Sequence, residues 1–442
     1  MGHNTSCNFS PGLIPIILIF TLGEKDFAKS KIFIDGDFKH ASTLREFLFN
    51  NTLEIFYVDK NTGQRSYLSK DKVTKVGFSE NDSILNDSIS SNHSYRLFRE
   101  YVIFPTKFLF FDINTIQFPS DLSRVRLYFG FKKNFPSWFS LNRSKLKTNV
   151  TPVVNSFNKI AEPIVLDDLK SEYTLSPELG DKNKFEIINI NKVTLSSPGI
   201  EGAFELPHIM DSEISVDGQG LSWSARFEKS FGTHNSVKLK IHGCDPEIND
   251  LSSQIALLEV TCHNKALAAK IAPGIQLFAN FELPGKCHIT RFPTNYVPRI
   301  MDADTLWKLA SRMDLSAAMF VKDASSSENA KMFKDYIKTH IPIGVDSKAL
   351  EVDSITDITM KSIVKEIRKD GKFAMAEGLA LSVIVDEDYF MESNLYLFGD
   401  ILNEMLSNLV SVNSFVLLRM STLQTPEEWE QWEPSHYGKP II

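Results

Sequence analysis

Cysteine and histidine side chains recur together in the middle of the chain, and these residue types can hold zinc. The candidate ligands span about 50 residues of a β-rich region: His242, Cys244, Cys262, His263, Cys287 and His288. Thiolates and imidazoles suit a tetrahedral zinc ion. Adjacent residues of a strand point to opposite faces, so a Cys-His pair cannot bind one ion with both members, although one residue from each pair could converge. We therefore predict no metal site.

Catalytic chemistry has only weak signals in this sequence. Cys262 could act as a nucleophile beside a distant histidine. The carboxylates of Asp167-Asp168 or Asp386-Glu387-Asp388 could serve glycoside hydrolysis, although charged pairs in turns are usually only solvated. The chain has no Walker loop, no HExxH motif and no GxSxG elbow. The sequence predicts no enzyme and no cofactor, and the alternative is a secreted or effector-type hydrolase with an unrecognised site.

Charge and composition restrict the class of partner. The 442 residues carry 48 Lys and Arg against 55 Asp and Glu, a formal net charge of −7, and the basic clusters are short. Nucleic acid is therefore excluded as a partner, because it requires an extended basic face. The four cysteines have no regular spacing, which indicates free thiols in a reducing cytoplasm. The 33 phenylalanines favour large cores and permanent protein interfaces.

One apolar run, Leu13 to Leu22, resembles a membrane segment at first sight. No Lys or Arg precedes it, and its length is about half of the ~20 residues that a spanning helix needs. Pro15 and the four isoleucines of the run fit a buried strand better. We predict no direct membrane insertion.

The first part of the chain alternates strands with a helix. Residues 31–37 and 53–58 are predicted strands, and residues 38–50 place their apolar side chains at helical spacing. Residues 79–95 are polar and rich in Ser and Asn, which indicates a surface loop. Residues 99–118 are the most aromatic stretch, and 122–131 alternates like a half-buried strand.

The remainder is β-rich in its centre and helical towards its end. Strands are predicted at 185–195, 221–228, 236–242, 255–262 and 379–385, and helices at 151–161, 304–320, 328–340 and 395–412. The fold class is α+β and multidomain, with a β-rich central part flanked by α/β segments. We predict an N-terminal α/β domain (1–98), an aromatic-rich strand region (99–150), a central β-rich domain (151–300) and a C-terminal α/β domain (301–442).

Several short motifs, in a consistent order along almost the whole chain, resemble those of the TssF (VasA/ImpG) family of type VI secretion system baseplate subunits. They begin with Ile32-Phe33-Ile34-Asp35-Gly36-Asp37, Arg99-Glu100-Tyr101, Phe104-Pro105, Lys107-Phe108-Leu109-Phe110-Phe111-Asp112 and Thr151-Pro152-Val153-Val154-Asn155-Ser156-Phe157. They continue with Thr261-Cys262-His263-Asn264-Lys265, Leu306-Trp307-Lys308-Leu309, Phe398-Gly399, Val412-Asn413-Ser414-Phe415 and a Trp432, Gly438 and Pro440 ending. The chain departs from the family at its start, since only about 30 residues precede the first motif where relatives carry a long, largely helical region.

The resemblance implies a structural role and a set of partners. It implies a fold similar to the wedge proteins of contractile-phage baseplates. In such a family the subunit forms wedges with TssG and a second copy of itself. The wedges surround the VgrG spike hub, bind TssE and seed the contractile sheath. TssK would connect them to the membrane complex, so the expected location is the cytoplasm, docked at the inner membrane. An adhesin-like surface protein is a further alternative, supported only by the central strands.

Large side chains within these motifs, all but one of them aromatic, are the candidates for partner interfaces, and packing in the chain's own core is their alternative role. The predicted interface residues are Phe104, Lys107, Phe108, Phe110, Trp307, Phe398, Phe415 and Trp432.

Overall fold

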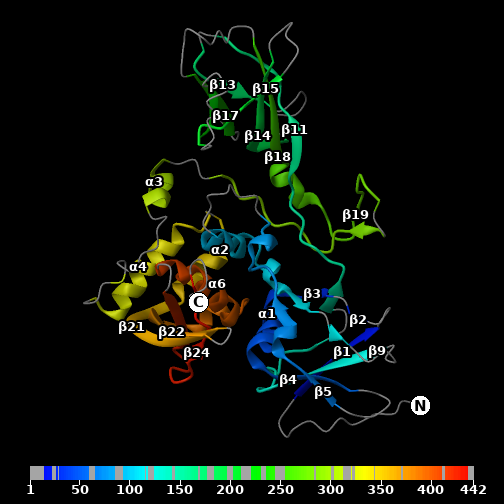
Figure 1. The fold of residues 1–442 in the computed structure, drawn as a ribbon, viewed down its shortest axis with the longest axis vertical. Helices are drawn as coiled ribbons and strands as arrows, with labels where there is room; N and C mark the ends of the chain where they lie inside the picture. The colour runs from blue at the N-terminus through cyan, green and yellow to red at the C-terminus, as the bar shows by residue number, and fades with distance from the viewer. Residues whose placement is uncertain are drawn as a thin grey trace. The chain divides into compact units, whose positions relative to one another are not determined.

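The chain divides into two compact units in a computed structural model (Figure 1). Unit 1 joins residues 1–152 to residues 308–442, and unit 2 comprises residues 153–307. The structure describes residues 14–436 except 22–25, 28, 59–64, 85–92, 115, 118–123, 142–144, 168–169, 177–183, 197–202, 211–220, 230–234, 244–253, 283–284, 300–302, 312–319, 321–323, 343, 370–371 and 411–413. The predicted second segment thus shares a unit with the first and fourth, and the four-domain division stays a prediction.

The N-terminal part of unit 1 contains two four-stranded sheets and two helices. One sheet has the order β1-β9-β4-β5 and the other β10-β3-β7-β6, and every pairing in them is antiparallel. The strands are β1 (Ile14–Thr21), β3 (Ser30–Ile34), β4 (Thr52–Val58), β5 (Arg65–Leu68), β6 (Val73–Lys75), β7 (Phe110–Ile113), β9 (Arg124–Phe131) and β10 (Leu146–Thr148), with a small β2–β8 pair (Asp26–Phe27, Ile116–Gln117). The helices are α1 (Phe38–Glu46), which continues as a π-helical turn to Asn51, and α2 (His93–Ile103).

The C-terminal part of unit 1 is a sheet of order β21-β22-β23-β24 with helices packed on it. The strands are β21 (Ile355–Lys369), β22 (Lys372–Val385), β23 (Phe415–Thr422) and β24 (Glu430–Gln431), and the helices are α4 (Ser326–Lys338), α5 (Asp346–Asp353) and α6 (Leu395–Leu406). β22 and β23 are parallel. A parallel pair needs a crossover connection, and α6 supplies it.

Side chains from both parts of unit 1 share one hydrophobic core. Phe98, Tyr101 and Phe108 from the N-terminal part pack in the same cluster as Phe398 and Leu418 from the C-terminal part, and all are at most 1% exposed. In Figure 1, α1 in blue and α6 in orange lie side by side, and the two helices are in contact. The two ends of the sequence are therefore one folded body.

Unit 2 consists of antiparallel strands in three groups. The larger sheet has the order β11-β18-β14-β15, with β12 also paired to β18, and the second has the order β13-β17-β16. The strands are β11 (Phe157–Ile160), β12 (Ile164–Val165), β13 (Tyr173–Leu175), β14 (Glu186–Ser196), β15 (Ala203–Leu206), β16 (Ser222–Lys229), β17 (Asn235–His242), β18 (Ile255–His263), β19 (Gln276–Leu277) and β20 (Cys287–His288). Alternation decides which face is buried: Ala256, Leu258 and Val260 of β18 are fully buried.

The structure confirms the mixed α and β fold and corrects three local predictions. Residues 157–160 are a strand paired to β18, whereas a helix was predicted at 151–161. Residues 93–103 are a helix, although 79–95 was expected to be loop and 99–118 strand-like. The long strand β21 was not predicted. No helix among the described residues is both long and apolar enough to span a bilayer.

Candidate functional site

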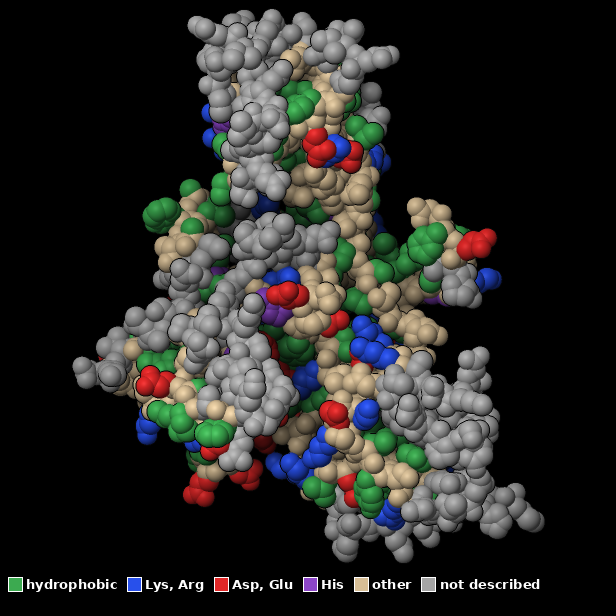
Figure 2. Space-filling view, viewed as in Figure 1, with side chains coloured by type: hydrophobic (Ala, Val, Ile, Leu, Met, Phe, Trp, Pro, Cys, Tyr) green, Lys and Arg blue, Asp and Glu red, His purple; other side chains and the backbone are tan. Residues whose placement is uncertain are grey.

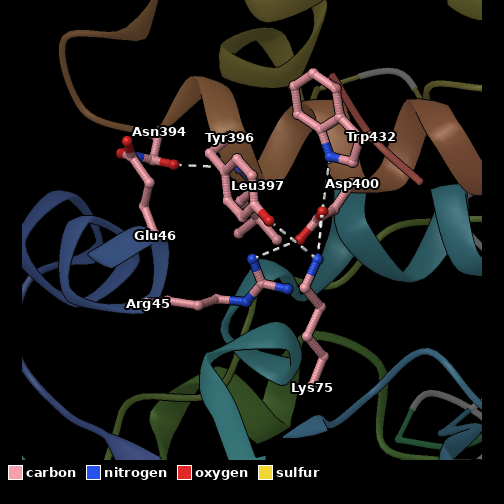
Figure 3. Close-up of polar contacts among 8 residues, drawn as sticks. All are labelled: Arg45, Glu46, Lys75, Asn394, Tyr396, Leu397, Asp400 and Trp432. Carbon is pink, nitrogen blue, oxygen red and sulfur yellow. Dashed lines mark hydrogen bonds and ion pairs between the residues drawn. The ribbon is translucent and has the colours of Figure 1, made fainter. Parts of the chain in front are cut away.

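A buried carboxylate, Asp400 on α6, is the centre of a polar junction within unit 1 (Figure 3). Its Oδ2 lies 2.7 Å from Nη1 of Arg45, a residue of α1, and its Oδ1 lies 2.7 Å from Nζ of Lys75, a residue of β6. The indole Nε1 of Trp432 donates to the same Oδ1 at 2.8 Å. Asp400 therefore joins the first 75 residues of the chain to its C-terminal segment.

Burial and charge pairing have opposite effects on the pKa values of the junction residues. Burial alone would raise the pKa of Asp400, but the charges of Arg45 and Lys75 outweigh it and hold that pKa below its usual value. Burial lowers the pKa of Lys75, and the charge of Asp400, which raises it, offsets this effect only in part. Removing one member of such a group leaves an uncompensated buried charge, which typically costs about 3–5 kcal/mol.

Helix caps fix the two helices that carry this junction. Asp37 caps α1 by accepting the backbone N–H of His40 at 2.9 Å. Asn394 caps α6 by accepting the backbone N–H of Leu397 at 3.2 Å, and its amide donates to Glu46 of α1 at 2.7 Å. The Asn394 side chain thus both caps the N-terminus of α6 and links that helix to α1.

A second buried junction is built from the aromatic-rich motif. The Lys107 ammonium is paired with the Glu100 carboxylate, and both side chains are at most 3% exposed. The Tyr101 hydroxyl donates to Glu351 of α5 at 2.6 Å, and Lys348 donates to the other carboxylate oxygen of Glu351 at 2.5 Å. Charged hydrogen bonds in a buried site stabilise one geometry strongly. The motif therefore ties α2 to the C-terminal part of unit 1.

Most of the predicted interface residues lie inside the chain's own core. Six are at most 6% exposed: Lys107, Phe108, Phe110, Phe398, Phe415 and Trp432. Their observed role is the alternative that the sequence left open, packing within the chain. Phe104 is half-buried. Trp307 is 75% exposed on α3 (Ala303–Ser311), and it has the most accessible side chain of the eight.

The candidate zinc ligands named from the sequence do not come together among the described residues, where no group of three side chains that could hold a metal occurs. Cys262 is fully buried, and burial raises its pKa, which disfavours the reactive thiolate. His263 lies 3.3 Å from Glu186, which also accepts from the Tyr296 hydroxyl at 2.6 Å. Cys287 is exposed on β20, and Cys244 lies outside the described residues.

The paired carboxylates have local structural roles where they are described. Asp386 caps a 3₁₀ turn by accepting from the Asp388 backbone and also accepts from Gln424. The backbone of Asp167 exchanges hydrogen bonds with the Tyr173 hydroxyl, and Asp168 lies outside the described residues. The hydrolase alternative gains no support from these contacts.

The sequence offered one unused signal for the Asp400 junction. Asp400 is a single charge within the apolar stretch Leu397-Phe398-Gly399-Asp400-Ile401-Leu402, and a charge on a buried helix face requires a partner. Nothing in the sequence around its partners Arg45 and Lys75 distinguishes them from the other basic residues of the chain. The site as a whole joins the N-terminal and C-terminal parts of unit 1.

The family model described as "Type VI secretion system, TssF" matches residues 20–439. The type VI secretion system component TssF1 of Pseudomonas aeruginosa is 20% identical in an alignment of 444 positions that covers 93% of this chain and 69% of the relative.

Two solved structures are similar in fold. The first is the TssK-TssF-TssG baseplate subcomplex of the type VI secretion system, seen by cryo-electron microscopy, with a TM-score of 0.75, 19% identity and coverage of 93% of this chain and 75% of that chain. The second is the baseplate complex from the type VI secretion system, with a TM-score of 0.52, 15% identity and coverage of 97% and 86%.

Proposed function

Since the chain belongs to the TssF family and is a structural subunit of the type VI secretion system baseplate, we propose that it forms wedges with TssG that surround the spike hub and seed the contractile sheath. The observation that carries the proposal is the family match over residues 20–439. The fold likeness to a solved TssK-TssF-TssG subcomplex supports TssG and TssK as partners.

The buried junctions of unit 1 fit this role. Arg45, Lys75 and Asp400 connect elements that are far apart in sequence, with ion pairs between largely buried side chains. Interactions of this kind favour one specific arrangement over neighbouring ones, which is what a repeated subunit needs.

Further partners follow from the same role. We include TssE, the VgrG spike and a second copy of the chain in the wedge. The assembled baseplate would lie in the cytoplasm and dock at the inner membrane through TssK. Among the eight predicted interface residues, Trp307 and Phe104 are the side chains that a partner can reach, and Trp307 is the stronger candidate because aromatic residues dominate interface energetics.

Co-expression with TssG tests the proposal. We expect a stable complex, and its mass measured by native mass spectrometry gives the number of copies of each chain. Replacing Trp307 with Asp should weaken the complex by about 10-fold or more. The control is Trp138→Asp, because Trp138 is 44% exposed and lies in a turn of unit 1, away from α3 in sequence. A chain that folds and stays alone beside TssG contradicts the proposal.

A further inference from the structure

A projecting segment of unit 2, residues 265–299, has the character of a binding arm. None of its described residues is buried, yet it carries large apolar side chains: Phe278 is 87% exposed, Phe292 70% and Phe281 67%. Figure 1 shows its β19–β20 hairpin standing apart from β14 and β18. We call this segment the arm.

The arm has a defined backbone in spite of having no core. β19 pairs with β20, and the ladder continues where Gly274 donates to the Ile289 carbonyl at 2.7 Å and Ile289 donates to the Ile275 carbonyl at 2.9 Å. Gly274 has a φ of +90°, a conformation that favours glycine. Exposed aromatic rings on a shaped segment mark interaction surfaces, because water contact with such area is unfavourable.

The arm is basic on an acidic protein. It contains Lys265, Lys270, Lys286, Arg291 and Arg299 against Glu282 alone, whereas the whole chain has a net charge of −7. Arg299 lies at the base of the arm, over the Phe227 ring of β16 at 3.6 Å from its centroid. Figure 2 shows hydrophobic side chains in green at this projection, with charged side chains beside them. The surface that covers the arm should therefore be apolar and negatively charged.

Unit 1 carries a surface of that description, formed by residues 386–392 and 423–430, which we call the acidic patch. The two segments touch: the Gln424 side chain donates to Asp386 at 2.8 Å and accepts from the backbone N–H of Glu387 at 3.2 Å. The patch contains seven carboxylates and neither Lys nor Arg: Asp386, Glu387, Asp388, Glu392, Glu427, Glu428 and Glu430. Red side chains gather at the lower left of Figure 2, beneath the place of the β24 label in Figure 1.

The acidic patch is also apolar enough to receive aromatic rings. Met391 is 74% exposed, Leu423 50%, and Tyr389 and Trp429 43% each. A contact between the arm and the patch would pair opposite charges around an apolar centre, the usual anatomy of a specific interface.

We propose that the arm of one copy binds the acidic patch of a second copy of this chain. The inference rests on the proposed function, in which two copies share a wedge, and it names the surfaces through which they meet. Because the arm and the patch are different surfaces, two copies can meet in two ways. Each arm can bind the other copy's patch about a two-fold axis, or one arm can bind one patch, so that each copy keeps a free surface for a further neighbour. The second arrangement builds rings or open chains.

Two charge-reversed variants test the proposal in the full-length chain. The arm variant carries Lys286→Glu and Arg291→Glu, and the patch variant carries Glu427→Lys and Glu428→Lys. Each variant alone should lose self-association by about 100-fold, because like charges then face each other. Mixed together, they should associate again, since the patch variant's arm and the arm variant's patch are both unaltered. Sedimentation velocity across micromolar concentrations measures this.

The matched control reverses two exposed charges that lie on neither surface, Lys331→Glu and Lys361→Glu, and it should associate like the unaltered chain. Thermal unfolding of every variant checks that it folds. An unaltered chain that stays monomeric, or variants that associate as well as the control, overturns the proposal. So does a mixture that stays monomeric, which is the result expected when the arm contacts its own chain.

Binding to TssG separates this inference from the proposed function. The unaltered chain should co-purify with TssG. If the chain binds TssG and the charge reversals do not change its self-association, only the arm contact is refuted. A chain that never binds TssG refutes the proposed function as well.

Discussion

Gly399 on α6 lies directly against the indole ring of Trp432, so closely that a Cβ at position 399 would overlap the ring. The same indole donates to Asp400, the residue after the glycine. The two family motifs that contain Gly399 and Trp432 are 33 residues apart in sequence and form one contact in the fold.

This contact predicts the effect of Gly399→Ala. Alanine ordinarily stabilises a helix interior by about 0.5–1 kcal/mol relative to glycine. Here the added methyl group must displace a buried ring, so we expect a net loss of about 1–3 kcal/mol in the free energy of unfolding, measured by urea denaturation. Gly285→Ala is the control, because a Cβ there has nothing within 4 Å. Equal stability of the two variants would contradict the contact.

Asp400→Asn should destabilise unit 1 strongly. The substitution keeps the side chain's shape but leaves Arg45 and Lys75 without their shared carboxylate. We expect a loss of about 3–5 kcal/mol, measured by calorimetry and denaturant unfolding. The comparison variant is Glu205→Gln, which breaks the exposed pair with Lys192 and should leave the melting temperature unchanged. An Asp400→Asn chain as stable as the Glu205→Gln chain would refute the role of the junction.

The same carboxylate predicts a pH dependence. Because the pKa of Asp400 is lowered in the folded chain, its contribution is present above the unfolded value of about 3.9 and is lost as the pH falls through the folded value. The stability difference between the unaltered chain and Asp400→Asn should therefore shrink below pH ~3.9. Burial raises the pKa of Glu46 and Glu404, whose effects have the opposite sign. The effect of Glu46 is common to both proteins, whereas the charge of Asp400 adds to the raised pKa of Glu404, so the substitution also brings that pKa closer to its usual value. A difference that is constant from neutral to acid pH would contradict this assignment.

The cysteines should differ in reactivity. Cys287 is exposed, whereas Cys262 is fully buried with a raised pKa. Maleimide labelling of the native chain at neutral pH, followed by peptide mapping, should modify Cys287 and spare Cys262. Labelling after denaturation, which should modify both, is the control. Rapid native labelling of Cys262 would contradict its burial.

Periodicity predicted the elements whose own residues decide their conformation. The alternation of Leu127, Phe129 and Phe131 predicted β9, and all three are buried on one face. The helical spacing of Phe398, Leu402 and Met405 predicted α6, which ends near residue 406 and not at 412.

The secondary structure differs from the sequence-based prediction where pairing with a distant segment determines the conformation. Phe157 was placed in a helix, but it pairs with Cys262 on β18, and that pairing overrides local preference. β21 has the charged sequence Lys361-Ser362-Ile363-Val364-Lys365-Glu366, which shows no clear alternation, and its pairing with β22 makes it a strand. Lys75 and Asp400 are 325 residues apart, and nothing in either neighbourhood indicates the other.

Unit 1 is assembled from the first and last stretches of the chain, with unit 2 inserted between them. During synthesis, Arg45, Tyr101 and Phe108 leave the ribosome long before Asp400, Glu351 and Phe398 have been translated. The nascent N-terminal part remains with apolar surface uncovered while the residues of unit 2 and the last part of unit 1 are still being synthesised, which exposes it to aggregation. Production of this subunit therefore depends on protection of its early segments until translation has ended.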